Sequence, residues 1–284
     1  MKFRAKLVDI GCIQQFTKVL STVSKISKTC TLRLSQDQVV LTQNEKAVNG
    51  GTSFWCEMNQ VDYFDEYRIE GKDEKNEIYL EINNENVLRA MRSGHTAQFI
   101  KIKLTKKQTP CLTFEITLSS LTAHTRNVIH DVPVAVIPTR YWDDFKKPTL
   151  PNYNIKIHTP NLKIMKSVVE RMKNISGFMV ITALQNGELC FKVETDEVTA
   201  STYFQNMLVE PNEKSTLVEH DIDDTESVGA RVDIQKLLSF LHAQLLNATK
   251  TICAIVDQKA VHMFVDCNDL LFQYFIPSTN IPIT

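Results

Sequence analysis

The same succession of elements occurs twice in this sequence, about 150 residues apart. Each copy opens with a strand-like stretch, continues into an amphipathic helix and later adds a second, shorter helix. The ranges are 3–8, 12–27 and 84–93 in the first copy and 154–158, 161–175 and 233–246 in the second. Because each copy must bury its own apolar side chains, the duplication predicts two similar domains, and 284 residues are enough for both.

Short stretches of alternating apolar and polar residues between these helices predict β-strands. They lie at 29–34, 39–41, 52–58, 67–70, 77–82, 99–104, 111–118 and 127–137 in the first half, and at 178–184, 188–193, 251–257, 261–265 and 270–276 in the second. Gly50-Gly51 supplies one turn, and Asn186-Gly187 is a strong signal for a two-residue hairpin loop. Since strands dominate, we expect an α+β fold in which antiparallel sheets carry helices on one side.

A proline-bounded segment separates the two halves. Pro138 and Pro151 enclose three aromatic residues, which is typical of a linker between domains. We therefore expect an N-terminal domain at 1–137, a connector at 138–151 and a C-terminal domain at 152–284. Residues 210–227 are rich in acidic and poor in apolar side chains, which predicts a mobile, solvated loop.

Composition argues against several classes of function. The formal net charge is −1, so any attraction to nucleic acid must come from uneven placement of charge. The seven cysteines form no C-x-x-C pair, which argues against a zinc ribbon and is typical of buried thiols in a reducing compartment. Neither a G-x-G-x-x-G sequence nor a P-loop occurs. With no secretory signal and no bilayer-length apolar run, we expect a soluble intracellular protein without cofactor or metal.

The helices carry basic side chains opposite their apolar stripes. In the first helix Lys18 and Lys25 are seven residues apart and share one side, while Ile13 and Phe16 share another. Across the four helices the basic set is Lys18, Lys25, Lys28, Arg89, Arg92, Lys163, Lys166, Lys173 and Lys236. Such lysines contact phosphates as point charges and read no base sequence. The alternative is that these side chains form a solvated helix face with no ligand. The repetition of the basic pattern in both halves favours a polyanion partner.

Two histidines invite an enzymatic interpretation. His130 precedes Asp131, and His262 lies near Asp266, as in some nucleases and hydrolases. Neither pair has a further residue at triad or metal-ligand spacing, and a lone histidine on a strand is more often structural. We therefore expect no catalysis.

Several stretches carry a resemblance to a known family. They are Met1-Lys2-Phe3-Arg4-Ala5-Lys6, Ala47-Val48-Asn49-Gly50-Gly51, Trp55-Cys56-Glu57, Glu77-Ile78-Tyr79-Leu80-Glu81, the run 165–175, Lys236-Leu237-Leu238-Ser239-Phe240-Leu241 and Gln273-Tyr274-Phe275-Ile276-Pro277. Together they resemble DNA sliding clamps of the PCNA superfamily. The resemblance is closest to the Hus subunit of the checkpoint clamp, the nine-one-one type ring that this subunit forms with two Rad partner proteins.

The resemblance implies a fold and a function. In these clamps three two-domain subunits close a ring around duplex DNA, with two helices per domain lining the channel and the sheets outside. It implies that the nine basic residues face DNA and that an ATP-dependent loader opens the ring. The implied function is a non-enzymatic subunit that encircles DNA at damage sites, supports DNA damage checkpoint signalling and tethers DNA repair enzymes. The implied location is the nucleus, with some protein in the cytoplasm.

The resemblance also implies two contact sites. Clamp subunits join through antiparallel edge strands, here by position Val132 to Ile137 and Thr199 to Gln205, and Pro133 favours a free edge in the first. The implied interface residues are Val132, Val134, Val136, Thr199, Ser201 and Tyr203. A pocket for partner peptides would be lined by Tyr141, Trp142, Phe145, Tyr274, Phe275, Ile276 and Pro277, unless these aromatics only pin the connector to a core. A PCNA-like homotrimer and a protein–protein scaffold that never encircles DNA remain the alternatives.

Overall fold

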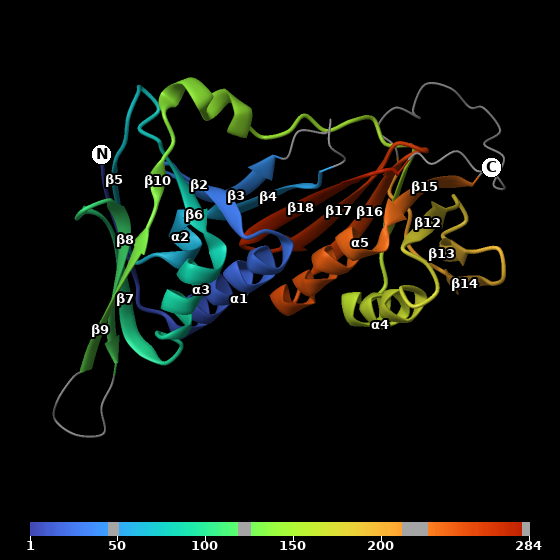
Figure 1. Cartoon of the computed structure of the whole chain (residues 1–284), viewed down its shortest axis with the longest axis horizontal. Coiled ribbons are helices and arrows are strands. Elements are labelled where there is room, and N and C mark those ends of the chain that lie inside the picture. The colour runs from blue at the N-terminus through green and yellow to red at the C-terminus, as the bar shows by residue number, and fades with distance from the viewer. Residues whose placement is uncertain (45–50, 119–125, 212–226, 280–284) are drawn as a thin grey trace. The chain divides into compact units, whose positions relative to one another are not determined.

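The computed structural model describes residues 1–44, 51–118, 126–211 and 227–279 (Figure 1). Gly50 of the turn predicted at Gly50-Gly51 and most of the acidic loop predicted at 210–227 lie outside these residues. The chain divides into two compact units. The first contains Met1–Gln43, Trp55–Lys147 and Asp269–Leu271, and the second contains Asn44–Phe54, Pro148–Asn268 and Phe272–Thr284. The division at Lys147 falls inside the predicted connector.

Strands dominate the first half and a few helices are interspersed, in agreement with the α+β prediction. The elements are β1 (Lys2–Leu7), α1 (Ile10–Ile26), β2 (Thr29–Leu34), β3 (Gln38–Asn44), β4 (Ser53–Asn59), α2 (Gln60–Tyr63), β5 (Glu66–Glu70), β6 (Ile78–Asn83), α3 (Asn84–Arg92), β7 (Ala97–Lys106), β8 (Pro110–Leu118), β9 (Arg126–Pro133), β10 (Ala135–Val136) and the 3-10 helix η2 (Thr139–Phe145). Within this half the strands neighbour one another in the orders β5-β1-β7-β8-β9 and β10-β6-β2-β3-β4. The short helices α2 and η2 were not predicted.

The helices of the first unit begin at side-chain caps. The Asp9 carboxylate accepts a hydrogen bond from the Cys12 amide at 2.9 Å, so α1 starts at Ile10, two residues before its predicted start. The Asn83 amide oxygen caps α3 in the same way by accepting from Asn86 N. As predicted, the apolar side of α1 is buried, while Lys25 lies in the last turn, where a positive charge complements the helix dipole.

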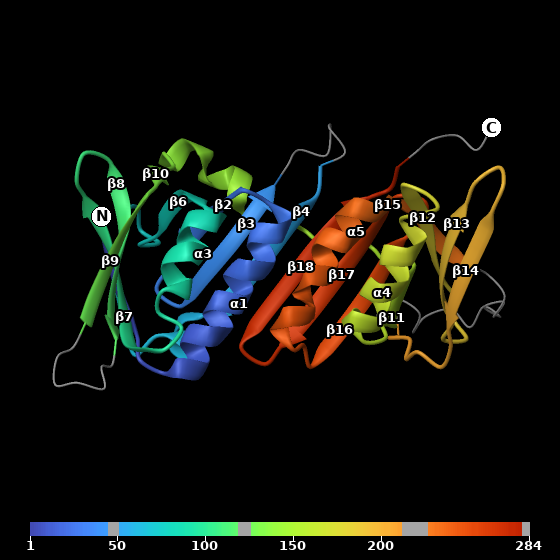
Figure 2. The ribbon, with the colours of Figure 1, turned by 60° about the horizontal axis from the view of Figure 1, so that its bottom comes forward.

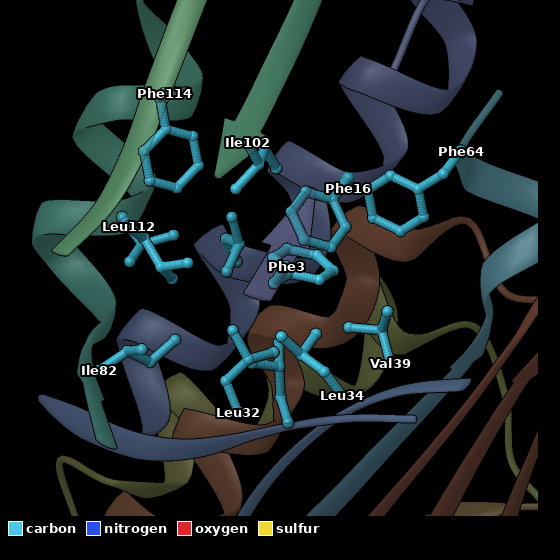
Figure 3. Close-up of a pocket in the computed structure, with 13 residues that line it drawn as sticks. Phe3, Phe16, Leu32, Leu34, Val39, Phe64, Ile82, Ile102, Leu112 and Phe114 are labelled. Carbon is cyan, nitrogen blue, oxygen red and sulfur yellow. The ribbon is translucent and has the colours of Figure 1, made fainter. Parts of the chain in front are cut away.

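The core of the first unit forms where α1 meets both sheets. Figure 3 shows Phe16 of α1 beside Phe3 and Phe64, with Leu32 and Phe114 contributed by strands of the two sheets. The apolar side chains enclose a residual space of about 20 Å³ with no polar lining, so the interior is close-packed and dry.

The second half repeats this plan. Its elements are β11 (Ile155–His158), α4 (Leu162–Met172), β12 (Phe178–Ala183), β13 (Leu189–Glu194), β14 (Thr199–Phe204), β15 (Val228–Asp233), α5 (Ile234–Leu241), the 3-10 helix η4 (His242–Leu246), β16 (Lys250–Val256), β17 (Ala260–Cys267) and β18 (Leu270–Pro277). The strand orders β11-β16-β17-β18 and β14-β13-β12-β15 correspond to those of the first unit. The helix predicted at 233–246 is α-helical only to Leu241 and ends as a 3-10 turn.

One predicted strand is wrong. The run 127–137 was expected to form a single strand, but β9 ends at Pro133 and β10 begins at Ala135 in the other sheet. Proline cannot donate to a ladder, and the next amide, Val134 N, donates instead to Pro110 O at 2.9 Å. The chain therefore crosses between the sheets at Val134. In the described residues no helix is long and apolar enough to cross a membrane.

Candidate functional site

The predicted basic residues gather on two pairs of helices. Figure 2 shows α1 beside α3 in the first unit and α4 beside α5 in the second, and each pair is packed together. The first pair carries Lys18, Lys25, Arg89 and Arg92, with Lys28 just after α1; the second carries Lys163, Lys166 and Lys236, with Lys173 capping α4. Lys18, Lys166 and Lys236 are half-buried, and the remaining six side chains are exposed.

Carboxylates on the same helices offset part of this positive charge. Arg89 Nη2 lies 3.2 Å from Glu85 Oε1, and Lys166 Nζ lies 3.8 Å from Glu170 Oε1, both at i,i+4 spacing. The Arg89 pair is well exposed, so it adds little to stability. Five of the exposed cations have no carboxylate within ion-pair distance among the described residues: Lys25, Lys28, Arg92, Lys163 and Lys173. These five are the strongest candidates for phosphate contact.

A polar cleft of about 350 Å³ lies between α4 and its neighbour α5. Lys166 and Lys173 line it from the first helix, and Gln235 and Ser239 line it from the second. Ammonium, amide and hydroxyl donors of this kind suit an anion. Glu170 also lines the cleft and reduces its positive potential.

The two predicted interface segments lie at sheet ends, with one correction. In the described residues β9 pairs only with β8, and β14 pairs only with β13, so each has one unpaired edge. The first open edge is therefore Arg126–Pro133 and not 132–137. Val134 lies between strands and is 7% exposed, and Val136 pairs with Leu80 of β6, so neither lies on that edge.

Of the interface residues, Val132 lies on β9 but its side chain is buried. On β14, Thr199, Ser201 and Tyr203 all lie on the exposed side, with Tyr203 59% exposed. The second segment thus matches the expected position of an edge strand, while the first is displaced toward Arg126.

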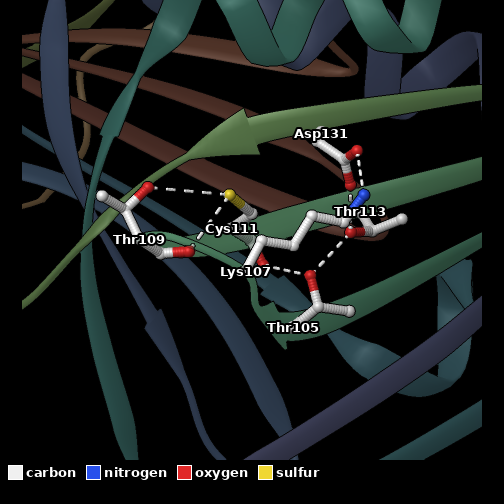
Figure 4. Close-up of polar contacts among 6 residues, drawn as sticks. All are labelled: Thr105, Lys107, Thr109, Cys111, Thr113 and Asp131. Carbon is white, nitrogen blue, oxygen red and sulfur yellow. Dashed lines mark hydrogen bonds and ion pairs between the residues drawn. The ribbon is translucent and has the colours of Figure 1, made fainter.

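The two histidine pairs are not assembled as catalytic groups. His130 and Asp131 are neighbours on a strand, so their side chains point to opposite faces of the sheet. Figure 4 shows Asp131 held by Lys107 and Thr113, whose hydrogen bonds lower the pKa of its carboxyl group. His262 Nδ1 lies 2.5 Å from Tyr153 Oη, and burial lowers the pKa of His262 to about 4. In the part of the chain described, no three His, Cys, Asp or Glu residues are placed to hold a metal ion.

The structure does not bring the predicted peptide pocket together as an exposed aromatic set. Trp142 is 8% exposed and stacks on Tyr79 with the ring centroids 4.4 Å apart. Tyr274 and Ile276 are fully buried, and Tyr274 stacks on Phe240 in the second unit. These three side chains serve the cores. Tyr141 is 45% exposed, and Phe145, Phe275 and Pro277 are half-buried.

A groove of about 590 Å³ in the first unit was missed by the sequence analysis. Its floor contains Arg33, Glu77 and Tyr79, and η2 forms one wall through Trp142 and its neighbours. Arg33 Nη2 lies 2.6 Å from Glu77 Oε1, and Tyr79 Oη donates to Glu77 Oε2 at 3.1 Å. Burial is the main cause that raises the pKa of Tyr79 to about 12. Of its lining residues, the sequence analysis had named only Trp142 as part of a peptide pocket.

Glu57 holds the connector against the first unit near Lys147. Lys147 Nζ lies 2.8 Å from Glu57 Oε2, and Trp55 Nε1 and Gln38 Nε2 donate to the same carboxylate at 2.9 and 2.6 Å. Burial opposes ionisation of Glu57, but these hydrogen bonds hold the pKa of its carboxyl group below the usual value. The wall of the groove is therefore held at two points, by Trp142 of η2 on Tyr79 and by Lys147 on Glu57.

Comparison with known proteins agrees with this geometry. Residues 1–280 match the family described as Hus1-like protein. The chain is 44% identical over 280 residues to the human checkpoint protein HUS1, covering 98% of this chain and 99% of that protein. It is 28% identical over 285 residues to the Drosophila melanogaster checkpoint protein Hus1-like, covering 98% and 99%.

Solved structures resemble the fold at much lower sequence identity. Proliferating cellular nuclear antigen (PCNA) from Entamoeba histolytica matches with a TM-score of 0.70 and 11% identity, covering 98% of this chain and 99% of that one. PCNA from Thermococcus kodakaraensis matches with a TM-score of 0.69 and 14% identity, covering 97% and 99%. Clamps of this kind are generally non-catalytic. The chain belongs to the Hus1-like family of checkpoint proteins and has the α+β fold of a PCNA-like clamp.

Proposed function

We propose that this chain is a non-enzymatic subunit of a heterotrimeric ring clamp that encircles DNA at damage sites. The observation that carries the proposal is the duplicated unit, in which a pair of packed helices presents basic side chains in both copies. A surface of this kind suits the backbone of duplex DNA, because lysine and arginine meet phosphates at many positions without reading bases.

The ring is proposed to close through strand pairing. The open edges of β9 and β14 each carry unpaired backbone donors and acceptors, which a neighbouring strand satisfies. Two Rad-type clamp subunits supply those strands in the proposed assembly, and an ATP-dependent loader opens the ring. The domains are proposed to divide at 1–137, 138–151 and 152–284, with the complex located in the nucleus and partly in the cytoplasm.

Repair enzymes are proposed to bind through short peptides beside the connector. The groove between η2 and the Arg33–Glu77 pair replaces the aromatic set as the candidate, because Trp142 and Tyr274 are buried. Tyr141 remains an exposed aromatic next to it, with the Arg140 guanidinium 4.7 Å from its ring centre.

The experiment that tests the assembly is mass by light scattering, for the chain alone and after co-expression with its two presumed Rad partners. We expect a monomer near 32.4 kDa alone and a one-to-one-to-one trimer with the partners. A homotrimer that ignores the Rad chains would support the PCNA-like alternative. If no trimer forms in either sample, only the scaffold alternative remains.

A further inference from the structure

Two arginines lie directly opposite each other on neighbouring strands of the first unit. The outer face of β1 carries three cations, Lys2, Arg4 and Lys6. The residues opposite them on β5 are, in the same order, Glu70, Arg68 and Glu66. The first and third pairs join opposite charges, whereas the middle pair joins two positive charges. Because like charges directly opposite on neighbouring strands are destabilising, the middle pair costs stability in the isolated chain.

The carboxylates beside this arginine pair are already engaged. Lys2 Nζ lies 2.7 Å from Glu70 Oε2, and Lys6 Nζ lies 3.4 Å from Glu66 Oε1. Both arginines of the middle pair are exposed, and neither has a carboxylate within ion-pair distance in the part of the chain described. Their two positive charges are therefore not compensated by the protein.

The positive charge continues on the other side of β1. There Arg4 lies opposite Lys103 of β7, whose ammonium group is 2.7 Å from Glu115 of β8. Lys101 lies on the same face, with its ammonium group 5.0 Å from the ring centre of Phe99 and no carboxylate within ion-pair distance among the described residues. Positive charge thus exceeds negative charge on this face, although the formal net charge of the whole chain is −1.

A phosphate monoester fits the arginine pair. It carries nearly two negative charges and three strong acceptor oxygens, and a guanidinium fork binds two such oxygens at once. Side chains directly opposite on neighbouring strands begin about 5 Å apart, so two guanidinium groups reach one phosphate from two sides. A carboxylate has one negative charge and two oxygens, which satisfy only one fork.

The neighbouring carboxylates restrict the kind of partner. Glu66 and Glu70 flank Arg68 on the same face of β5, two residues away in each direction. A continuous nucleic-acid backbone along this strand would bring further phosphates beside these carboxylates, and the like charges would repel. A single phosphate on a protein segment avoids that repulsion, so the arrangement favours a phosphorylated protein over DNA.

We propose that Arg4 and Arg68 form a binding site for a phosphorylated side chain of a partner protein. Clusters of arginine are a common means of recognising phosphorylated segments. The site lies on strands and not on the basic helices, so it does not depend on the proposed ring. Binding also removes the repulsion between the two arginines, because the phosphate neutralises both.

The test uses the full chain and a fluorescein-labelled peptide mixture with phosphoserine at its centre and randomised residues on both sides. The same mixture with serine at the centre and a labelled duplex DNA are the comparison ligands. Fluorescence polarisation at low salt measures the affinity for each. We expect the phosphoserine mixture to bind at least ~tenfold more tightly than the serine mixture, because only the phosphate joins both guanidinium groups.

The variants are Arg68→Glu and Arg68→Gln, with Lys106→Glu as the matched control at an exposed lysine of the same sheet. Arg68→Glu completes the opposite charges of the ladder, so we expect a higher melting temperature at low salt. We expect its affinity for the phosphoserine mixture to fall at least ~tenfold, a combination that a general loss of folding does not produce. Arg68→Gln removes the charge without adding one, and it should lose the same binding even if the glutamate variant unfolds.

The control Lys106→Glu is expected to keep the affinity for the phosphoserine mixture. Equal binding of the phosphoserine and serine mixtures overturns the proposal, as does unchanged phosphoserine binding by both Arg68 variants. If Arg68→Gln weakens the binding of duplex DNA as much as that of the phosphoserine mixture, the face is a general polyanion surface and the phosphate site is overturned. The proposed ring stands or falls separately.

Discussion

The two units share a backbone plan but secure their second helix differently. In the first, Asn84 N donates to Lys28 O at 2.9 Å; in the second, Ile234 N donates to Gly177 O at 3.0 Å. The side chains diverge: Asn84 Nδ2 donates to Ser27 O, and the Cys30 thiol donates to Asn84 Oδ1, whereas Ile234 is simply buried. The duplication thus preserves the backbone contact and tolerates either a polar or an apolar side chain beneath it.

The structural similarity of the two units extends to segments that are too short to show a periodic sequence pattern. After β9, Ala135 and Val136 pair with β6; after β18, Thr279 N donates to Arg231 O of β15 at 2.9 Å. Likewise β5 pairs with β1 over five residues, while its counterpart in the second unit is the single bridge from Val209 to Ile157. The second unit therefore follows the same topology with fewer regular hydrogen bonds.

The largest effect is expected from breaking one core at a time. Phe114→Ala removes a ring from the core of the first unit, and Phe240→Ala removes the ring that stacks on Phe272 and Tyr274 in the second. Each is expected to lower the free energy of unfolding by about 3–5 kcal/mol in urea titrations. Hydrogen exchange should rise mainly in the unit that carries the change, and equal increases in both units would contradict separate cores. Tyr141→Ala, on an exposed ring, serves as the control.

The second largest effect is expected from acid, which should destabilise the second unit through its buried histidine. His262 is buried with a pKa of about 4, and the first unit has no histidine buried to this degree among its described residues. The pKa of His262 is near 6.5 in the unfolded chain and about 4 in the folded chain. Between these two values only the unfolded chain binds the proton, so the free energy of unfolding falls as the pH decreases. We expect a loss of about 2 kcal/mol from pH 7 to pH 5. Urea titrations of His262→Gln should lose this dependence, and an unchanged slope would contradict the assignment.

Exchanging the helix anchor gives a smaller effect. Asn84→Ile copies the second unit into the first and leaves Ser27 O and the Cys30 thiol without their partner. We expect a loss of about 1–2 kcal/mol in the free energy of unfolding, because isoleucine fits the equivalent position but cannot hydrogen-bond. Asn86→Ile, at an exposed position of α3, is the matched control. A stabilised Asn84→Ile variant would show that the polar anchor is dispensable.

The smallest effect concerns the basic helices. Lys25→Ala in the first unit and Lys173→Ala in the second should each reduce the slope of log affinity for duplex DNA against log salt by at most ~1, uniformly across sequences. Arg89→Ala and Lys166→Ala should change it less, because each cation is already paired on its helix. Lys2→Ala, on a strand, is the control. Larger effects at the paired residues would contradict this ranking.

Much of the fold was predictable because it depends on local periodicity. The buried stripe of α1 and the basic side chains opposite it follow from 3.6-residue spacing, and the structure has both. The split after Pro133 was not predictable, since Val132, Val134 and Val136 alternate as one strand would while the chain changes sheets.

The candidate peptide site failed for a related reason. On β18 the side chains alternate between core and surface, and Tyr274 and Ile276 face the core while Phe275 does not. The sequence shows where the aromatic residues are, but it does not show which face of β18 is buried against the core. The groove beside η2 depends on a tertiary contact, the stacking of Trp142 on Tyr79, which no local pattern encodes.

The most direct test of the proposed ring is retention on DNA of two topologies. The assembled complex is placed by a loader on a nicked circle or on the same DNA made linear, and retention is measured after washing at high salt. A ring that encircles DNA stays on the circle and slides off the linear molecule, because it is held topologically and not by screened charge. Equal release from both forms would contradict encirclement and leave the basic helices as an ordinary electrostatic surface.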